Sequence, residues 1–167
     1  ANPKRIYDTN NNEVKIILVS RIIKEKGILK FIKIAEYFNQ NTTSFSFSLI
    51  GGVDENNKYL NSILNKSEKR LKNFKWFGKL DQETVKKFLR ESNIFLYPST
   101  YSEGIPRVLL EAANANLYII SYDTPGCNEI VIDKVNGELI DVKQPISSFI
   151  KAIKRYSKNI NNEIIMF

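Results

Sequence analysis

The sequence predicts an α/β fold in which a doubly wound parallel sheet carries helices on both faces. Short apolar runs recur along the chain, and stretches with apolar residues at helical spacing separate them. These runs are short and mainly apolar, which is expected of strands in a parallel sheet that is covered on both faces. The length of 167 residues fits one domain with a substantial core.

The first half of the chain predicts three strands with helices between them. The strands are apolar runs that end at turn residues, and they are expected over 14–20, 45–50 and 74–77. The intervening stretches carry apolar residues three and four positions apart, which predicts helices at 27–39 and within 54–72. Glycines follow the second and third strands and favour chain reversals there.

The second half continues the alternation. Strands are expected over 93–97, 118–122 and 138–142, and helices over 82–91, from after Gly104 to about Ala115, and over 146–157. Asp81 is placed to cap the helix at 82–91, because its carboxylate can accept a hydrogen bond from a free amide of the first turn. Turns are expected at 123–126 and at Asn136-Gly137.

The composition excludes several kinds of chemistry. The chain has no histidine and a single cysteine, so His-based catalytic triads, His-ligated metals, an internal disulfide and a multi-cysteine zinc site are excluded. The net charge of +7 suits a phosphate-bearing ligand, nucleic acid or an anionic membrane surface. The lysines are scattered, however, and most are expected to be ordinary surface charges.

Candidate ligand-binding loops follow four of the predicted strands. In an open α/β sheet, ligands bind beyond the carboxyl ends of the strands. The loops carry Ser20-Arg21 with Lys26-Gly27, then Gly51-Gly52, then Gly78, and then residues 99–106. Arg21 and Lys26 precede a helix start and suit an anion, although exposed surface charges would look the same.

Two glutamates eight positions apart stand out around the helix after Gly104. The free amides of residues 104–108 could receive phosphate oxygens at the helix start, and Arg107 would add charge. Glu111 lies among apolar residues in mid-helix. Eight helical positions span roughly 12 Å, which suits two ends of an extended ligand better than a proton relay. Alternatively, Glu103 is an ordinary acid at a helix start and Glu111 a surface residue.

Together these motifs resemble the C-terminal, donor-binding domain of the retaining glycosyltransferases of family four, one Rossmann-like half of a GT-B fold. The resemblance covers about residues 14–157, and Glu103 and Glu111 match the family's Glu-x7-Glu pattern. It is carried by SRIIKEKG (20–27), LIGG (49–52), FKWFGKL (74–80), FLYPSTYSEGIPRVLLEA (95–112), SYDTPGCNEIV (121–131) and NGELID (136–141). The chain departs from the usual pattern at Ser20, Arg107, Asn116 and Tyr118, which bears on the donor sugar.

The resemblance implies a role for each candidate residue. Arg21 and Lys26 would hold the diphosphate of a nucleotide-sugar, and Glu103 would face the transferred sugar. The base would lie against Gly78, Lys79 and Leu80. The amides of Gly104, Ile105 and Val108 would contact sugar and phosphates, and Glu111 would accept hydrogen bonds from the ribose hydroxyls.

The resemblance also implies the partners of the whole protein. The donor would be a UDP-sugar, and the acceptor a glycan or lipid-linked molecule bound by an N-terminal domain that this chain lacks. Residues 1–167 would thus be one domain, inactive alone, that needs neither cofactor nor metal. By analogy, the enzyme would build bacterial capsule, lipopolysaccharide or another surface polysaccharide. Its location would be the cytoplasm, with peripheral contact at the inner face of the plasma membrane.

Other functions remain as alternatives. A nucleotide-sugar epimerase, a sugar-phosphate synthase or a non-catalytic nucleotide-sugar-binding domain would share the GT-B architecture. A nucleic-acid-binding domain is disfavoured, because no known module pattern is present and the aromatic residues lie mostly in apolar stripes. A dinucleotide-dependent dehydrogenase is disfavoured, because no Gly-x-Gly-x-x-Gly motif follows the first strand.

Overall fold

The computed structural model describes residues 13–42, 44–101 and 104–165, with side chains up to residue 160. All strand pairs in its sheet are parallel, and the strand order is β3-β2-β1-β4-β5-β6. The strands are β1 (Val14–Val19), β2 (Phe45–Ile50), β3 (Phe74–Trp76), β4 (Ile94–Tyr97), β5 (Tyr118–Tyr122) and β6 (Gly137–Ile140). The predicted parallel sheet is therefore confirmed.

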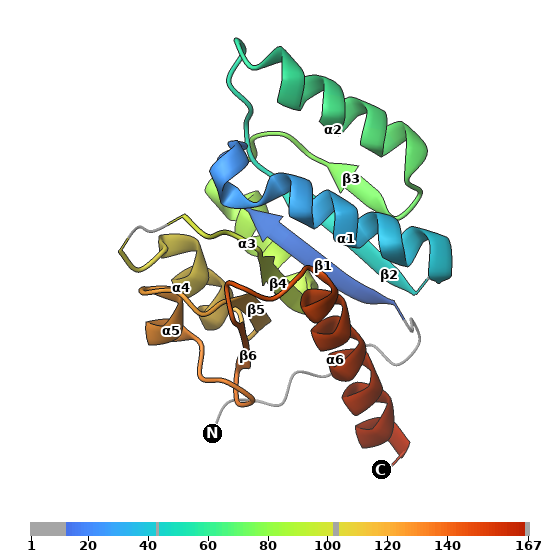
Figure 1. Ribbon diagram of the computed structural model, residues 1–167, viewed down its shortest axis with the longest axis vertical. Helices are drawn as coiled ribbons and strands as arrows, with labels where there is room; N and C mark the ends of the chain where they lie inside the picture. The colour runs from blue at the N-terminus through green and yellow to red at the C-terminus, as the bar shows by residue number, and fades with distance from the viewer. Residues whose placement is uncertain (1–12, 43, 102–103, 166–167) are drawn as a thin grey trace.

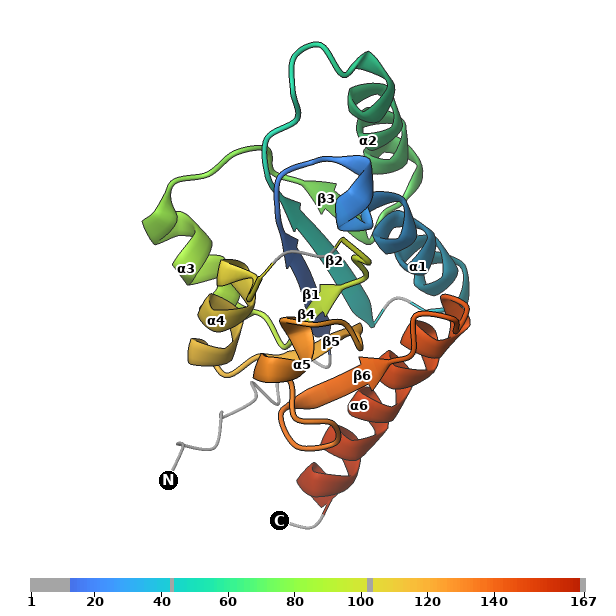
Figure 2. The ribbon, with the colours of Figure 1, turned by 60° about the vertical axis from the view of Figure 1, so that its left-hand side comes forward.

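Helices cover both faces of the sheet, as predicted. Figures 1 and 2 show α1, α2 and α6 on one face and α3 and α4 on the other. The helices are α1 (Ile28–Asn41), α2 (Lys58–Arg70), α3 (Gln82–Glu91), α4 (Arg107–Asn114), α5 (Cys127–Ile130) and α6 (Ser147–Ile165), and a 3₁₀ turn, η1 (Lys24–Lys26), precedes α1.

Side-chain caps mark the starts of α2 and α3. The Asp81 carboxylate accepts a hydrogen bond from the Thr84 amide at 2.8 Å, so the cap and helix predicted from the sequence are confirmed. The same hydrogen bond lowers the pKa of Asp81. Helix α2 begins at Lys58, inside the predicted stretch, and Asn57 caps it by accepting from the Leu60 amide at 3.1 Å.

Several elements differ from the prediction, and α6 runs to Ile165 although its helix was expected to end near residue 157. The short helix α5 was not expected, because four residues are too few to show helical periodicity. Gly137 was predicted as a turn residue, but it is the first residue of β6. A β-carbon at Gly137 would lie 1.9 Å from the carbonyl oxygen of Ile119 on β5, so only glycine allows the two strands to pair there.

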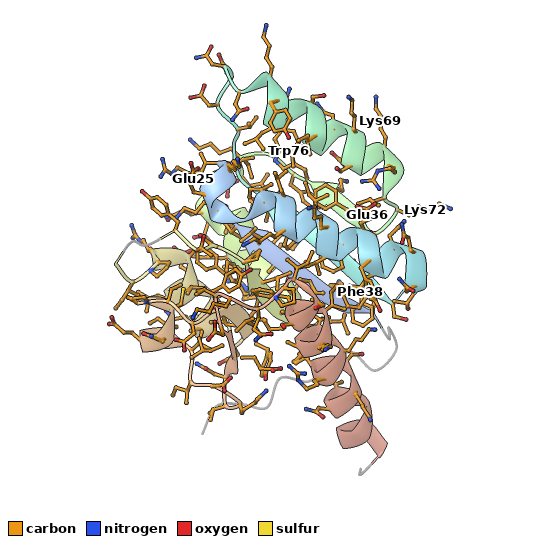
Figure 3. The ribbon with its side chains drawn as sticks, in the orientation of Figure 1. Glu25, Glu36, Phe38, Lys69, Lys72 and Trp76 are labelled. Carbon is orange, nitrogen blue, oxygen red and sulfur yellow. The ribbon has the colours of Figure 1, made fainter. Side chains whose placement is uncertain are left out.

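The core lies between the sheet and its helices. The phenyl ring of Phe31 on α1 packs edge-on against Phe47 of β2, with ring centroids 5.6 Å apart. Figure 3 shows the side chain of Phe38 within the body of the molecule, whereas those of Lys69 and Lys72 project away from it. An ion pair of 2.8 Å between Glu36 and Arg70 joins the outer sides of α1 and α2.

A buried glutamate ties α6 to the end of the sheet. The carboxylate of Glu138 on β6 is 3 % exposed and accepts hydrogen bonds from Lys134 and from Arg155 of α6, each at 2.6 Å. Burial acts to raise the pKa of Glu138, but the two hydrogen-bonded cations outweigh it and the pKa is lowered. Burial, together with the Glu138 charge, raises the pKa of neighbouring Tyr118 to about 12.

The strand order reverses between β1 and β4. From β1 the chain adds β2 and β3 on one side and then returns to place β4 on the other side of β1. The loops that leave the carboxyl ends of β1 and β4 therefore run in opposite directions and leave an opening between them, which is where ligands bind in such sheets.

Candidate functional site

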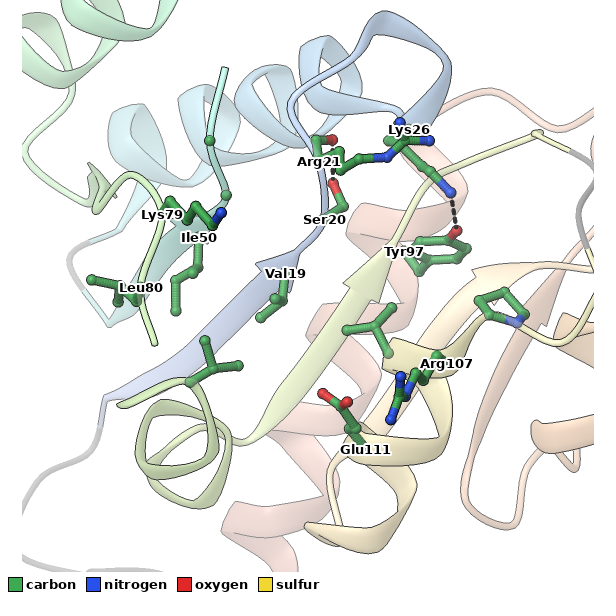
Figure 4. Close-up of a pocket in the computed structure, with 15 residues that line it drawn as sticks. Val19, Ser20, Arg21, Lys26, Ile50, Lys79, Leu80, Tyr97, Arg107 and Glu111 are labelled. Carbon is green, nitrogen blue, oxygen red and sulfur yellow. Dashed lines mark hydrogen bonds between the residues drawn. The ribbon is translucent and has the colours of Figure 1, made fainter. Parts of the chain in front are cut away.

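A cavity of about 570 Å³ lies at the carboxyl ends of the central strands (Figure 4). The loops after β1, β2 and β3, the end of β4 and the start of α4 all contribute to its walls. The lining residues are Val19, Ser20, Arg21, Lys26, Ile50, Gly51, Gly52, Lys79, Leu80, Val85, Tyr97, Pro106, Arg107, Val108 and Glu111. The predicted convergence of separate loops on one edge of the sheet is therefore present in the structure.

One wall is cationic and comes from the loop between β1 and α1. Arg21 lies two residues after the end of β1 and is exposed, whereas Lys26 is only 6 % exposed. Gly27, which follows Lys26, has a φ of 76°, and a β-carbon there would lie 2.1 Å from the carbonyl oxygen of Pro98. Glycine is thus required for the start of α1 to approach the end of β4, and this approach places Lys26 in the cavity wall.

The opposite wall is the first half of α4. Arg107, Val108 and Glu111 line the cavity, and Figure 4 shows Arg107 and Glu111 side by side on the cavity side of the helix. Pro106 is the N-cap residue, with φ −64° and ψ 119°. The Leu109 amide donates to the Pro106 carbonyl at 3.0 Å, whereas the amides of Arg107 and Val108 precede the first intrahelical acceptor. The helix dipole favours a negative charge in front of these two amides.

A third wall comes from the loops that follow β2 and β3. The Gly51 amide donates a hydrogen bond to the Gly78 carbonyl at 2.8 Å, and the Trp76 indole donates to the Gly51 carbonyl at 2.9 Å. These bonds hold the two loops together. Lys79 and Leu80 then reach the cavity beside Gly52, where a β-carbon would come 3.5 Å from that of Lys79.

Most of the predicted site residues meet in this cavity. Arg21, Lys26, Lys79, Leu80, Val108 and Glu111 all line it. Arg21 and Glu111 lie in facing walls, which is the arrangement that the functional prediction requires. The roles assigned to these residues remain predictions.

Three predicted residues do not line the cavity, and one cannot be placed. Gly78 lies in the loop behind Lys79, with a φ of 70°, and its carbonyl is engaged by Gly51. Gly104 and Ile105 precede α4 and are exposed, with Ile105 45 % accessible. Any contribution from these two would come from backbone amides rather than from side chains. Glu103 lies outside the described residues.

Four lining residues were missed by the sequence analysis, namely Val19, Ile50, Val85 and Tyr97. Val19 and Ile50 were assigned only to strands. Tyr97 was assigned only as the end of a strand, although a hydroxyl at the last position of a fully buried strand signals a polar neighbour. Val85 belongs to the amphipathic helix α3, and its apolar position there does not distinguish packing on the sheet from facing a ligand.

The charges of the lining residues are unevenly distributed. Basic side chains come from three separate loops or helices, namely Arg21 and Lys26, Lys79, and Arg107, whereas Glu111 is the acid among these lining residues. Such a site can hold an anion between several cations while its carboxylate accepts hydrogen bonds from hydroxyl groups. Among the described residues, no three His, Cys, Asp or Glu side chains cluster as metal ligands do.

In the part of the chain that the structure describes, no helix combines the length and the apolar character needed to cross a bilayer.

Comparison with known sequences gives one family and several relatives. Residues 2–163 match the family model described as "Glycosyl transferases group 1". The amylovoran biosynthesis glycosyltransferase AmsK of Erwinia amylovora is 28 % identical, over 81 % of this chain and 34 % of its own length. The UDP-Gal:α-D-GlcNAc-diphosphoundecaprenol α-1,3-galactosyltransferase of Escherichia coli is also 28 % identical, over 97 % of this chain and 43 % of its own length.

Comparison with solved structures confirms the fold. Anabaena Alr3699/HepE, solved in complex with UDP and glucose, superposes with a TM-score of 0.71 over 89 % of this chain and 38 % of that one, at 18 % sequence identity. This identity supports the fold alone, a Rossmann-like half of a GT-B enzyme. The chain spans about a third to two fifths of the length of the curated relatives that it matches.

Proposed function

Because the chain belongs to the glycosyl transferases group 1 family, we propose that it is the donor-binding half of a retaining glycosyltransferase that uses a UDP-sugar. The observation that carries the proposal is that Arg21 and Lys26 share a cavity with Glu111 and face it across the carboxyl ends of β1 and β4. An activated sugar has a doubly anionic diphosphate and a ribose diol, and this pairing of cations with a distant carboxylate suits both groups.

The proposed binding mode assigns one part of the donor to each wall. Arg21 and Lys26 hold the diphosphate, and the uracil lies against Lys79 and Leu80. The free amides at the start of α4 contact the sugar and phosphates, and Glu111 accepts hydrogen bonds from the ribose hydroxyls. Glu103, outside the described residues, is assigned to the transferred sugar on the family resemblance alone.

The choice of UDP rests on the relatives. The E. coli relative is named for a UDP-galactose donor, and the Anabaena neighbour was solved with UDP and glucose. We further propose that the reaction is metal-independent. In that case the cationic wall and the helix amides stabilise the departing diphosphate, the task that a divalent ion performs elsewhere.

The acceptor is proposed from the relatives as well. One relative is named for amylovoran biosynthesis and another for a diphosphoundecaprenol-linked acceptor, which supports a glycan or lipid-linked acceptor in surface polysaccharide synthesis. The acceptor would bind to an N-terminal domain of the longer protein. A lipid-linked acceptor would place the enzyme in the cytoplasm, in peripheral contact with the inner face of the membrane.

Calorimetry of this chain with UDP, ADP and GDP tests the proposal. We expect UDP to bind best, and we expect its affinity to be equal with magnesium and with EDTA. Arg21→Ala should weaken UDP about tenfold or more, because it removes hydrogen bonds between charged groups. Lys151→Ala, which removes an exposed cation on α6, serves as the control and should bind as the parent does. Equal UDP affinity in the parent and in Arg21→Ala would refute the site assignment.

A further inference from the structure

The ammonium group of Lys26 is held inside the cavity wall by aromatic side chains. The residue is 6 % exposed, and its Nζ lies 3.5 Å from the Tyr97 hydroxyl (Figure 4) and 4.9 Å from the centre of the Tyr101 ring. A buried ammonium needs acceptors for its donors or an aromatic face. Tyr97 supplies an acceptor and Tyr101 supplies a face.

The position of Tyr97 indicates that its hydroxyl, rather than its ring, is the feature that matters. Tyr97 is the last residue of β4, a strand whose four residues are all buried, and it is itself 1 % exposed. A phenylalanine would bury the same ring without the cost of desolvating a hydroxyl. The hydroxyl faces the cavity wall and meets Lys26 there.

Tyr101 is fixed relative to Lys26 by a buried serine. The Ser99 hydroxyl donates to the carbonyl of Glu25 at 3.0 Å and accepts from the Tyr101 amide at 3.2 Å. Glu25 belongs to η1, the turn that also carries Lys26. The loop after β4 and the turn before α1 are therefore joined, and the Tyr101 ring and the Lys26 ammonium lie on the two sides of this junction.

We propose that Tyr97 and Tyr101 are positioning residues that hold the Lys26 ammonium in the place where it meets the donor diphosphate. This inference rests on the proposed function of the cavity. A lysine has a flexible four-carbon stem, and ordering that stem upon ligand binding costs affinity. Holding the ammonium in place before the ligand arrives removes much of this cost.

The chain contains a matched control for the Lys26–Tyr97 pair. The Lys30 ammonium lies 3.0 Å from the Tyr122 hydroxyl and 4.6 Å from the centre of that ring. Tyr122 is the last residue of β5 and is 2 % exposed, so its environment matches that of Tyr97. Neither Lys30 nor Tyr122 lines the cavity. Tyr122→Phe therefore measures the effect of losing a part-buried Lys–Tyr contact away from the ligand.

The test compares UDP with uridine, which lacks the diphosphate. UDP affinity is measured by calorimetry and uridine affinity by NMR titration of this chain. Tyr97→Phe should weaken UDP about fivefold, since it removes one long hydrogen bond to a charged group, and should leave uridine unchanged. Tyr101→Leu should also weaken UDP alone. Tyr122→Phe should change neither ligand.

A double variant links the effect to the lysine. Lys26→Ala should weaken UDP and not uridine, and Tyr97→Phe should have no further effect in the Lys26→Ala background. Because Tyr101 is 43 % exposed, Tyr101→Leu remains informative even if Tyr97→Phe proves unstable in a thermal melt.

The possible results separate this inference from the proposed function. If the parent chain binds UDP no better than uridine, the diphosphate site fails, and the inference fails with it. If the parent prefers UDP but Tyr97→Phe and Tyr101→Leu bind it normally, only the positioning role is wrong. Equal weakening of UDP and uridine by Tyr97→Phe would also overturn that role, because it would indicate general damage to the fold.

Discussion

Glu111 shows how neighbours in sequence differ from neighbours in space. It lies between apolar residues in the sequence, and Leu109 and Ala112 are fully buried. Successive helical residues point about 100° apart, so Glu111 shares a face with Arg107 and Val108 instead. That face lines the cavity, and the Glu111 carboxylate is half-buried there rather than enclosed in the core.

The proposed contact between Glu111 and the ribose can be isolated with a modified ligand. UDP should bind this chain about tenfold more tightly than 2′-deoxy-UDP, because the missing hydroxyl leaves the carboxylate with an unfilled acceptor. In Glu111→Ala the two ligands should bind equally. Calorimetry with both nucleotides gives all four affinities.

Leu110→Ala is the control for this measurement. Leu110 lies on the same helix and is 43 % exposed, and it does not line the cavity. This variant should keep the preference for UDP over 2′-deoxy-UDP. A preference that persists in Glu111→Ala would show that another group contacts the ribose.

At the scale of secondary-structure elements, the contact between β6 and α6 depends on one carboxylate. Among the described strands, β6 pairs with β5 alone, and α6 packs across both strands. The Glu138 carboxylate joins this helix to the strand through Arg155 and also accepts from Lys134 of the preceding loop. The side chains of Lys134 and Arg155 are about half exposed, so solvent screening weakens each ion pair.

Replacing Glu138 should lower stability in a pH-dependent way. Glu138→Gln should reduce the free energy of unfolding at pH 7 by about 1–2 kcal/mol, as expected for lost hydrogen bonds between charged groups. The pKa of Glu138 is lowered in the folded protein, so its contribution is complete above the ordinary glutamate pKa and disappears as the pH falls through the folded value. Urea unfolding from pH 7 to pH 3 measures the difference.

The parent chain and Glu138→Gln should therefore have similar free energies of unfolding at acid pH. Glu83→Gln provides the comparison, because Glu83 is exposed and forms a long ion pair of 3.5 Å with Lys86. That variant should match the parent at each pH within about 0.5 kcal/mol. A Glu138→Gln deficit that is as large at pH 3 as at pH 7 would mean that packing, rather than charge, explains the loss.

At the scale of the whole molecule, the sheet topology brings the candidate site together. Loops from distant parts of the sequence meet at the carboxyl edge, where the strand order reverses between β1 and β4. In the relatives this chain corresponds to about a third to two fifths of a longer protein. An open edge of this kind is suited to face a second domain.

If this chain binds the donor and another domain binds the acceptor, the chain alone should bind the donor without catalysing transfer. UDP-sugar should bind to the chain in calorimetry, yet an assay of UDP release should detect no transfer, since the acceptor site is expected in the other domain. The longer protein should release UDP when a suitable acceptor is added. The same assay on the longer protein with Arg21→Ala tests whether this cavity is required for transfer. Transfer by the chain alone would contradict the proposal.

The sequence by itself determined the class of fold and the type of each main element. Apolar runs, helical spacing and the Asp81 cap are local signals, and local signals are sufficient where burial on both faces of a sheet favours mainly apolar strands. The family resemblance also selected Arg21, Lys26, Lys79, Leu80, Val108 and Glu111, which the structure brings into one cavity. The sequence did not predict α5, because a helix of four residues is too short to show helical periodicity.

Only the tertiary structure decided which side chains contact one another across that cavity. The pairing of Lys26 with Tyr97 joins residues 71 positions apart, and no periodicity within either segment encodes it. It arises because β1 and β4 lie side by side and because Gly27 can approach Pro98 closely. Contacts of this kind depend on how whole elements pack. The sequence therefore identified the candidate residues, and packing determined how the Lys26 ammonium is held.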